Sequence, residues 1–154
     1  MMETVKAIAL LGLLCLPAAG VSAGEIEDAC TELVLDYALY RDRFDADPYA
    51  NIFAEDAVLT VLGQVYTGRA AIRQRLLDGR DGQITRHMMS TIRIFVQDDQ
   101  TASGVSYVTV YGANPGEFPL DAAVTAVGEY HDKFVRTAQG WKIARRTFVP
   151  VFNG

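Results

Sequence analysis

The 154-residue sequence contains few cysteine and histidine residues, and it has no excess of positive charge. It has 14 Lys and Arg residues against 19 Asp and Glu residues, which gives a net charge of −5. The basic surface typical of nucleic-acid-binding proteins is therefore missing, and we expect neither nucleic acid nor an anionic membrane surface as a partner. With two cysteines and two histidines, the sequence has no Cys/His cluster at the spacing of a zinc site. Because it also lacks a phosphate-binding glycine motif, we expect no metal and no other cofactor.

The sequence also lacks an apolar run long enough to cross a membrane. Its longest run, residues 7–16, is shorter than the ~20 residues that span a bilayer. Lys6 precedes this run, and Pro17, small residues and Ala23 follow it, a pattern typical of a cleaved secretory signal peptide. The alternative is a buried N-terminal helix, against which Pro17 argues. We predict that residues 1–23 are removed, that the protein is periplasmic or secreted, and that it has no membrane partner after cleavage.

The remaining residues, 24–154, are expected to form one domain. Cys30 is the only cysteine among them, so no disulfide can form within the domain and its stability must come from a hydrophobic core. The sequence is 50% apolar and 21% charged, which is too hydrophobic for a disordered chain.

The periodicity of the apolar residues predicts three helices followed by several strands. Helical spacing covers residues 25–44, a short helix is expected at 49–53, and Gly68 opens a third helix that ends near Gly79. Strands are expected at 57–62, 64–67, 85–97, 105–113, 124–135 and 141–152. This order predicts an α+β fold, a cone or barrel in which a curved antiparallel sheet wraps around three N-terminal helices and leaves a cavity at its open end. Trp141 is expected to be buried under this sheet.

Six short motifs resemble one known family. They are Tyr37-x4-Asp42, Phe53-Ala-Glu-Asp-Ala-Val58, Gly68-Arg69, Thr85-Arg-His87-Met88, Tyr130-His-Asp132-Lys133 and Gly140-Trp-Lys-Ile-Ala-Arg-Arg146. Together they resemble the SnoaL-like branch of the cystatin-like, nuclear-transport-factor-like cone superfamily. That superfamily includes scytalone dehydratase, bile acid dehydratase and hexachlorocyclohexane dehydrochlorinase, together with non-catalytic modules.

The resemblance implies roles for particular residues. Asp42 and His87 fall where the lyases of the superfamily keep an Asp–His dyad, and Tyr37 matches a Tyr of the bile acid enzyme. Arg146 matches an Arg that the dehydrochlorinase uses near its leaving group. Val110 and Pro150 stand where the bile acid enzyme has an Asp and an Arg, which argues against bile acid chemistry.

The chemistry of the two dyad residues agrees with this resemblance. Histidine, with an ordinary pKa near ~6.5, is the natural general base near neutrality, and a carboxylate on its second nitrogen fixes the tautomer. The alternative is that Asp42 is a solvated helix-end residue and His87 is structural. Strand alternation places His87 opposite the apolar face of Ile92 and Ile94, unless a β-bulge near Ser90 reverses the alternation. The sequence leaves both arrangements open. His131 alternates with charged residues and is expected to face solvent.

The sequence thus supports two functional hypotheses. The first is a cofactor-independent, dehydratase-like lyase or isomerase acting on a small, hydrophobic, cyclic molecule. In it, His87 removes a carbon-bound proton, Asp42 orients His87, and Tyr37 donates to the leaving or enolising oxygen. Candidate substrate-binding residues are Arg146, Tyr107, Tyr111 and Phe53; Arg146 has an ion pair with Asp132 as its alternative role. The second hypothesis is a non-catalytic small-ligand-binding or protein-interaction module of the same fold. Assembly into a homodimer or homotrimer is left open.

Overall fold

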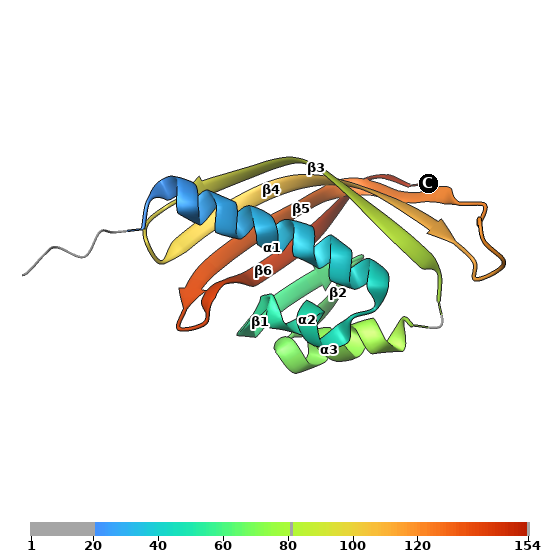
Figure 1. Cartoon of the computed structure of the whole chain (residues 1–154), viewed down its shortest axis with the longest axis horizontal. Helices are drawn as coiled ribbons and strands as arrows, with labels where there is room; N and C mark the ends of the chain where they lie inside the picture. The colour runs from blue at the N-terminus through green and yellow to red at the C-terminus, as the bar shows by residue number, and fades with distance from the viewer. Residues whose placement is uncertain (1–20, 81, 154) are drawn as a thin grey trace, which may run out of the picture.

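The computed structural model describes residues 21–80 and 82–153. Most of the predicted signal peptide, residues 1–20, lies outside the described part of the chain. The elements are α1 (Ala23–Arg43), α2 (Ala46–Asn51), β1 (Phe53–Val61), β2 (Gln64–Thr67), α3 (Arg69–Asp78), β3 (Ile84–Val96), β4 (Thr101–Ala113), β5 (Ala123–Thr137) and β6 (Gly140–Asn153). Figure 1 shows α1 lying along the sheet, with α2 and α3 beside its C-terminal half.

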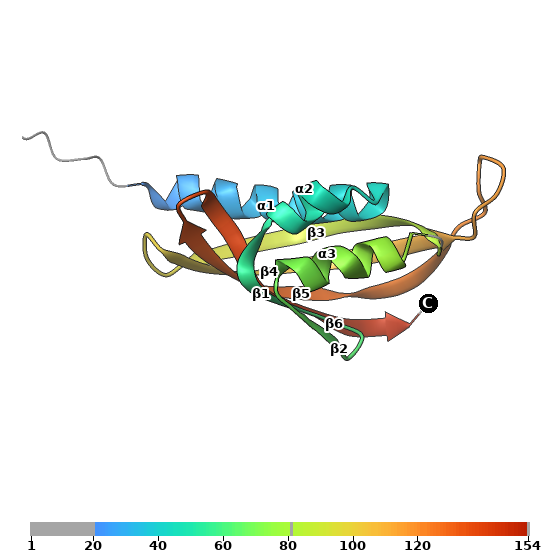
Figure 2. The same ribbon diagram turned by 90° about the horizontal axis from the view of Figure 1, so that it is seen from below.

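The described strands form one six-stranded sheet in the order β2-β1-β6-β5-β4-β3. Figure 2 shows the helices on one face of this curved sheet. The predicted α+β class is therefore confirmed, with two differences in detail. The sheet is mixed, because β6 inserts between β1 and β5 and runs parallel to β1. It is also open, because β2 and β3 form its two edges and do not pair with each other.

The predicted element boundaries differ most at the start of the sheet. The short helix predicted at 49–53 is α2, which runs from Ala46 to Asn51 with Pro48 in its first turn. β1 begins at Phe53 rather than at Ala57, because Phe53 already pairs with Ile143 of β6. The apolar spacing around Phe53 fits the end of a helix as well as the start of a strand. The pairing with β6, which is distant in the sequence, is what makes Phe53 part of the strand.

Helix α1 is fixed at both ends and packs one face on the sheet. Its N-cap Ser22 forms a reciprocal capping box with Glu25, and its C-cap Phe44 has a left-handed backbone with φ 56°. Cys30 lies in the buried face, where burial raises the pKa of its thiol to about 12. The thiol is therefore protonated at neutral pH and is a packing residue.

A β-bulge in β3 decides which way His87 points. The register with β4 shifts between Ser90 and Arg93, and Thr91 has a positive φ of 47°. Ser90 and Thr91 are both exposed, so the alternation restarts after them, and His87 shares the helix-covered face with Ile92. Of the two arrangements that the sequence left open, the structure contains the one with the bulge.

Two other side-chain expectations have different outcomes. His131 is exposed, as expected, and its Nε2 lies 2.8 Å from Oε2 of Glu129. Trp141 packs against the core as expected, but its indole is only partly buried. It lies near the hairpin end of β6, opposite Arg136.

No helix in the described part of the chain is both long enough and apolar enough to span a membrane.

Candidate functional site

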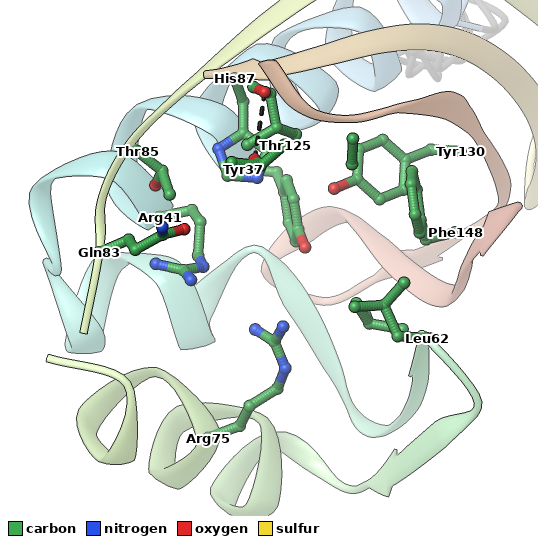
Figure 3. Close-up of a pocket in the computed structure, with 13 residues that line it drawn as sticks. Tyr37, Arg41, Leu62, Arg75, Gln83, Thr85, His87, Thr125, Tyr130 and Phe148 are labelled. Carbon is green, nitrogen blue, oxygen red and sulfur yellow. Dashed lines mark hydrogen bonds between the residues drawn. The ribbon is translucent and has the colours of Figure 1, made fainter. Parts of the chain in front are cut away.

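A cavity of about 240 Å³ lies between the C-terminal half of α1, α3 and the sheet. Figure 3 shows the side chains that line it. The lining residues are Tyr37, Arg41, Val61, Leu62, Arg75, Gln83, Thr85, His87, Val110, Thr125, Ala126, Tyr130 and Phe148. The wall is mixed, with aliphatic and aromatic side chains next to guanidinium, imidazole and hydroxyl groups. Among the described residues, no three His, Cys, Asp or Glu side chains cluster as metal ligands would.

His87, which lines the cavity, lies in direct contact with Asp42. The Asp42 Oδ1 atom is 2.6 Å from Nδ1 of His87, and its Oδ2 atom accepts the backbone N–H of His87 at 2.7 Å. The hydroxyl of Thr85 donates to Oδ1 of Asp42 at 2.9 Å. The two side chains are only 10% and 8% exposed, so little water competes for these bonds. The structure therefore brings together the two residues that the sequence motifs paired.

The position of each residue in the fold explains the contact. β3 is an edge strand, so its outward backbone N–H groups have no strand partner, and Asp42 satisfies one of them. Asp42 itself lies in the last turn of α1, where the helix dipole disfavours a negative charge. Burial raises the pKa of Asp42, but the hydrogen bonds from His87 and Thr85 outweigh burial and hold the pKa below its ordinary value.

This contact fixes the tautomer of the histidine. An ionised carboxylate can only accept hydrogen bonds, so Nδ1 of His87 carries the proton that points at Asp42. In the neutral ring, Nε2 is then the unprotonated nitrogen. Since His87 lines the cavity, Nε2 is the basic atom available to a bound molecule.

Tyr37 belongs to both the cavity and the core. Its ring stands perpendicular to that of His87, with 6.3 Å between the ring centroids, and it also packs against Tyr49 and Tyr130. Tyr37 is 1% exposed, and its hydroxyl points into the cavity in Figure 3. The structure therefore places this residue within the same site as the Asp42–His87 pair.

Arg146 does not line the cavity; it lies in the core in an ion pair with Asp132. Its Nε donates to Oδ1 of Asp132 at 2.8 Å and its Nη2 to Oδ2 at 2.7 Å, with the guanidinium 4.2 Å from the ring centroid of Tyr37. Burial lowers the pKa of Arg146, but Asp132 outweighs burial and raises it above the ordinary value. Of its two alternative roles, the structure shows the ion pair with Asp132.

The other three candidate substrate-binding residues also lie away from the cavity. Phe53 is fully buried between Tyr37 and Tyr49. Tyr107 and Tyr111 are 46% and 41% exposed and are not among the residues that line this cavity. The buried positions of β4 alternate with them and are small or aliphatic: Ala102, Gly104, Ser106, Val108, Val110 and Gly112. A Cβ on Gly104 would lie 2.9 Å from Ile94, so large side chains are confined to the other face of this strand.

Sequence reasoning missed two arginines of the cavity. Arg41 lies one helical turn after Tyr37, and Arg75 lies on the same stripe of α3 as the buried Ile72 and Leu76. Residues four apart share a helix face, so a signal for both was present in the spacing. An arginine within an otherwise apolar helix stripe indicates a cation that faces the interior, and Arg75 fits this pattern.

The fold and the site together define the class of protein: an open, curved α+β sheet whose helix-covered face holds a small-molecule-sized cavity. The chain belongs to the SnoaL-like domain family, whose model matches residues 23–147. This confirms the resemblance seen in the sequence motifs. None of the curated proteins is a significant match to the chain.

Several solved structures share the fold. A candidate scytalone dehydratase from Novosphingobium aromaticivorans is 25% identical, with a TM-score of 0.71 over 82% of this chain and 85% of that one. A candidate aromatic ring hydroxylase from the same organism is 26% identical, with a TM-score of 0.74 over 86% and 93% of the two chains. A protein of unknown function with a cystatin-like fold from Nostoc punctiforme is 21% identical, with a TM-score of 0.70 over 85% and 94%.

Proposed function

We propose that this protein is a cofactor-independent, dehydratase-like lyase or isomerase acting on a small, cyclic, largely hydrophobic molecule. The observation that carries the proposal is the 2.6 Å contact between Asp42 and Nδ1 of His87, which leaves Nε2 as a base at the cavity wall. The candidate scytalone dehydratase among the solved relatives supports the same reaction class.

In the proposed reaction, Nε2 of His87 removes a proton from a carbon next to a carbonyl group. The electron pair of the broken C–H bond moves to the carbonyl oxygen, and Tyr37 donates a hydrogen bond to the resulting enolate. Asp42 stabilises the imidazolium and holds its orientation without taking the proton. The enolate then either expels a β-hydroxyl group, which leaves as water with the proton of the imidazolium, or, where a neighbouring double bond extends it to a dienolate, regains that proton at the γ-carbon. The first outcome is a dehydration and the second an isomerisation.

The proposal can be tested with carbon acids of one ring. Cyclohexanone and 3-hydroxycyclohexanone are incubated with the protein in D2O, and NMR follows exchange at the α-carbon and formation of cyclohexenone. We expect His87→Gln to slow exchange by ~10²–10⁴-fold, the usual contribution of a general base. Asp42→Asn would present an amide N–H to Nδ1, which reverses the tautomer, so a comparable loss is expected.

A matched control and a double variant sharpen this test. His131→Gln removes the other histidine, which is exposed and lies against Glu129, and should leave the exchange rate unchanged. The Asp42→Asn, His87→Gln double variant should be scarcely slower than the slower single variant, because the two residues act on one proton transfer. A ketone that binds in the cavity but exchanges equally fast with wild type and His87→Gln would refute the proposal. A non-catalytic binding module would then be the better description.

A further inference from the structure

Two guanidinium groups enter the cavity from different helices. Arg41 comes from the last turn of α1, and Arg75 comes from α3 on the other side of the cavity. In Figure 3, Arg75 extends from α3 toward Tyr37, and Arg41 extends into the same space. Both groups keep their positive charge at every physiological pH.

Within the described part of the chain, neither arginine has a carboxylate partner. Arg69, Arg73 and Arg146 each form an ion pair there, with Glu55, Asp47 and Asp132 respectively, whereas the described ion pairs include neither Arg41 nor Arg75. The Nη1 atom of Arg41 is buried and has no hydrogen-bond acceptor among these residues. Arg41 as a whole is only partly buried, but a buried N–H donor without an acceptor is itself costly, so its retention calls for an explanation.

Aromatic side chains position both arginines without using their donors. The guanidinium of Arg75 lies 5.4 Å from the ring centroid of Tyr66, and that of Arg41 lies 5.3 Å from that of Phe44. Such contacts orient the planar group and leave its N–H donors free for a ligand. The Asp42 carboxylate is already used, because its oxygens accept three hydrogen bonds from His87 and Thr85.

We infer that Arg41 and Arg75 bind a carboxylate group of the ligand. A planar guanidinium matches a carboxylate through paired hydrogen bonds. The two guanidinium groups carry two positive charges, and Asp42 supplies one negative charge, so one positive charge is left for a ligand. The whole protein has a net charge of −5, so the positive character of the cavity is local. The inference rests on the proposed function for the place of the ligand, and it narrows the substrate class from a hydrophobic ring to a ring acid.

The volume of the cavity limits the rest of the ligand. An apolar cavity of ~150 Å³ is enough for benzene. The 240 Å³ found here therefore has room for one ring with a carboxylate and a few further atoms. Val110, Phe148 and Val61 supply the apolar wall for the ring, and His87 lies at the same wall as Val110.

The test compares ring carboxylates with their neutral amides. Binding of benzoate, cyclohexanecarboxylate and phenylacetate, and of the three matching amides, is measured by NMR titration of the full-length protein. We expect at least one carboxylate to bind more tightly than its amide. Arg41→Gln and Arg75→Gln should each weaken carboxylate binding about 10- to 100-fold, the loss of a charge-assisted hydrogen bond, and should leave amide binding within about twofold.

Controls separate this inference from the proposed function and from a structural role. Arg43→Gln and Arg73→Gln remove arginines two residues away on the same helices and should leave carboxylate binding unchanged. His87→Gln should slow proton exchange as described above yet keep carboxylate binding, so the proposed function and the carboxylate site can be refuted separately. The ligand-free Arg41→Gln and Arg75→Gln variants should melt close to the wild-type temperature, because each loses one cation–π contact and no ion pair.

Three results would overturn the inference. The first is equal affinity for the carboxylates and the amides. The second is an absence of binding by all three carboxylates. The third is a sharp fall in the melting temperature of Arg41→Gln and Arg75→Gln without ligand, which would make both arginines structural.

Discussion

At the residue scale, Asp42 links the candidate site to the stability of the fold in acid. Its pKa in the folded protein is lowered by the hydrogen bonds from His87 and Thr85, which outweigh the effect of burial. The ionised carboxylate therefore stabilises the folded state above the unfolded-state pKa of ~3.9, and this contribution is lost as the pH falls through the lower folded-state pKa. Asp42→Asn should melt below wild type near pH ~5, and the difference should narrow toward pH ~2. Melting curves at several pH values measure this, and parallel curves throughout would contradict it.

The buried Arg146–Asp132 ion pair should make the fold sensitive to the loss of either charge alone. Asp132→Asn leaves a fully buried guanidinium without its counter-charge, which should cost ~3–5 kcal/mol of unfolding free energy. The double variant Arg146→Met, Asp132→Leu removes both charges and should be clearly more stable than Asp132→Asn alone. Urea unfolding measures both values. Equal losses in the two variants would mean that the cost comes from packing rather than from the unpaired charge.

Individual residues differ in how far the sequence could place them. Asp42 and His87 were found because they carry chemistry and stand in recognisable motifs. Tyr107 and Tyr111 were misplaced because aromatic side chains were assumed to face the core, although small residues occupy the inner positions of β4. Whether Arg146 pairs with Asp132 or faces a ligand depends on strand register, which one sequence does not determine.

At the element scale, the bulge in β3 carries a local strain that can be measured. Thr91 is β-branched and has a φ of 47°, a region that costs an L-residue ~1–2 kcal/mol and glycine nothing. Glycine loses ~0.5–1 kcal/mol through the greater freedom of the unfolded chain. Thr91→Gly should therefore be neutral or up to ~1.5 kcal/mol more stable than wild type. Thr109→Gly, in regular β4, is the matched control and should be destabilising. Equal destabilisation of both variants would show that Thr91 has no strained backbone.

The same scale shows why the sheet was only partly predictable. Alternation located the four long strands, because each buries one face against the helices. The parallel pairing of β1 with β6 joins segments far apart in the chain, so no local pattern indicates it. The bulge likewise has no sequence signal beyond two adjacent polar residues, Ser90 and Thr91.

At the scale of the whole molecule, the face of the sheet opposite the helices exposes apolar side chains. Among the described residues these include Met88, Tyr107, Val149 and Val151, on three different strands. Assembly into a homodimer or homotrimer stays a prediction, and this face is the place to test it. If the protein is oligomeric, sedimentation should show Val151→Glu as a smaller species than wild type, because a buried charge opposes association. An oligomer unaffected by this change would use another surface.

The N-terminal segment of the chain predicts export of the protein. The sequence pattern predicts cleavage after Ala23, yet Ser22 caps α1, and Val21 packs against the core. Cleavage at that site would remove a Ser N-cap worth ~1 kcal/mol and place a new amino group at the positive end of the helix dipole. We expect the intact mass of the exported protein to correspond to Gly24–Gly154, and this form to melt below a chain that begins at Val21. An exported mass that includes Val21 and Ser22 would instead show that cleavage occurs upstream of the cap. A full-length chain that stays with the membrane would contradict export itself.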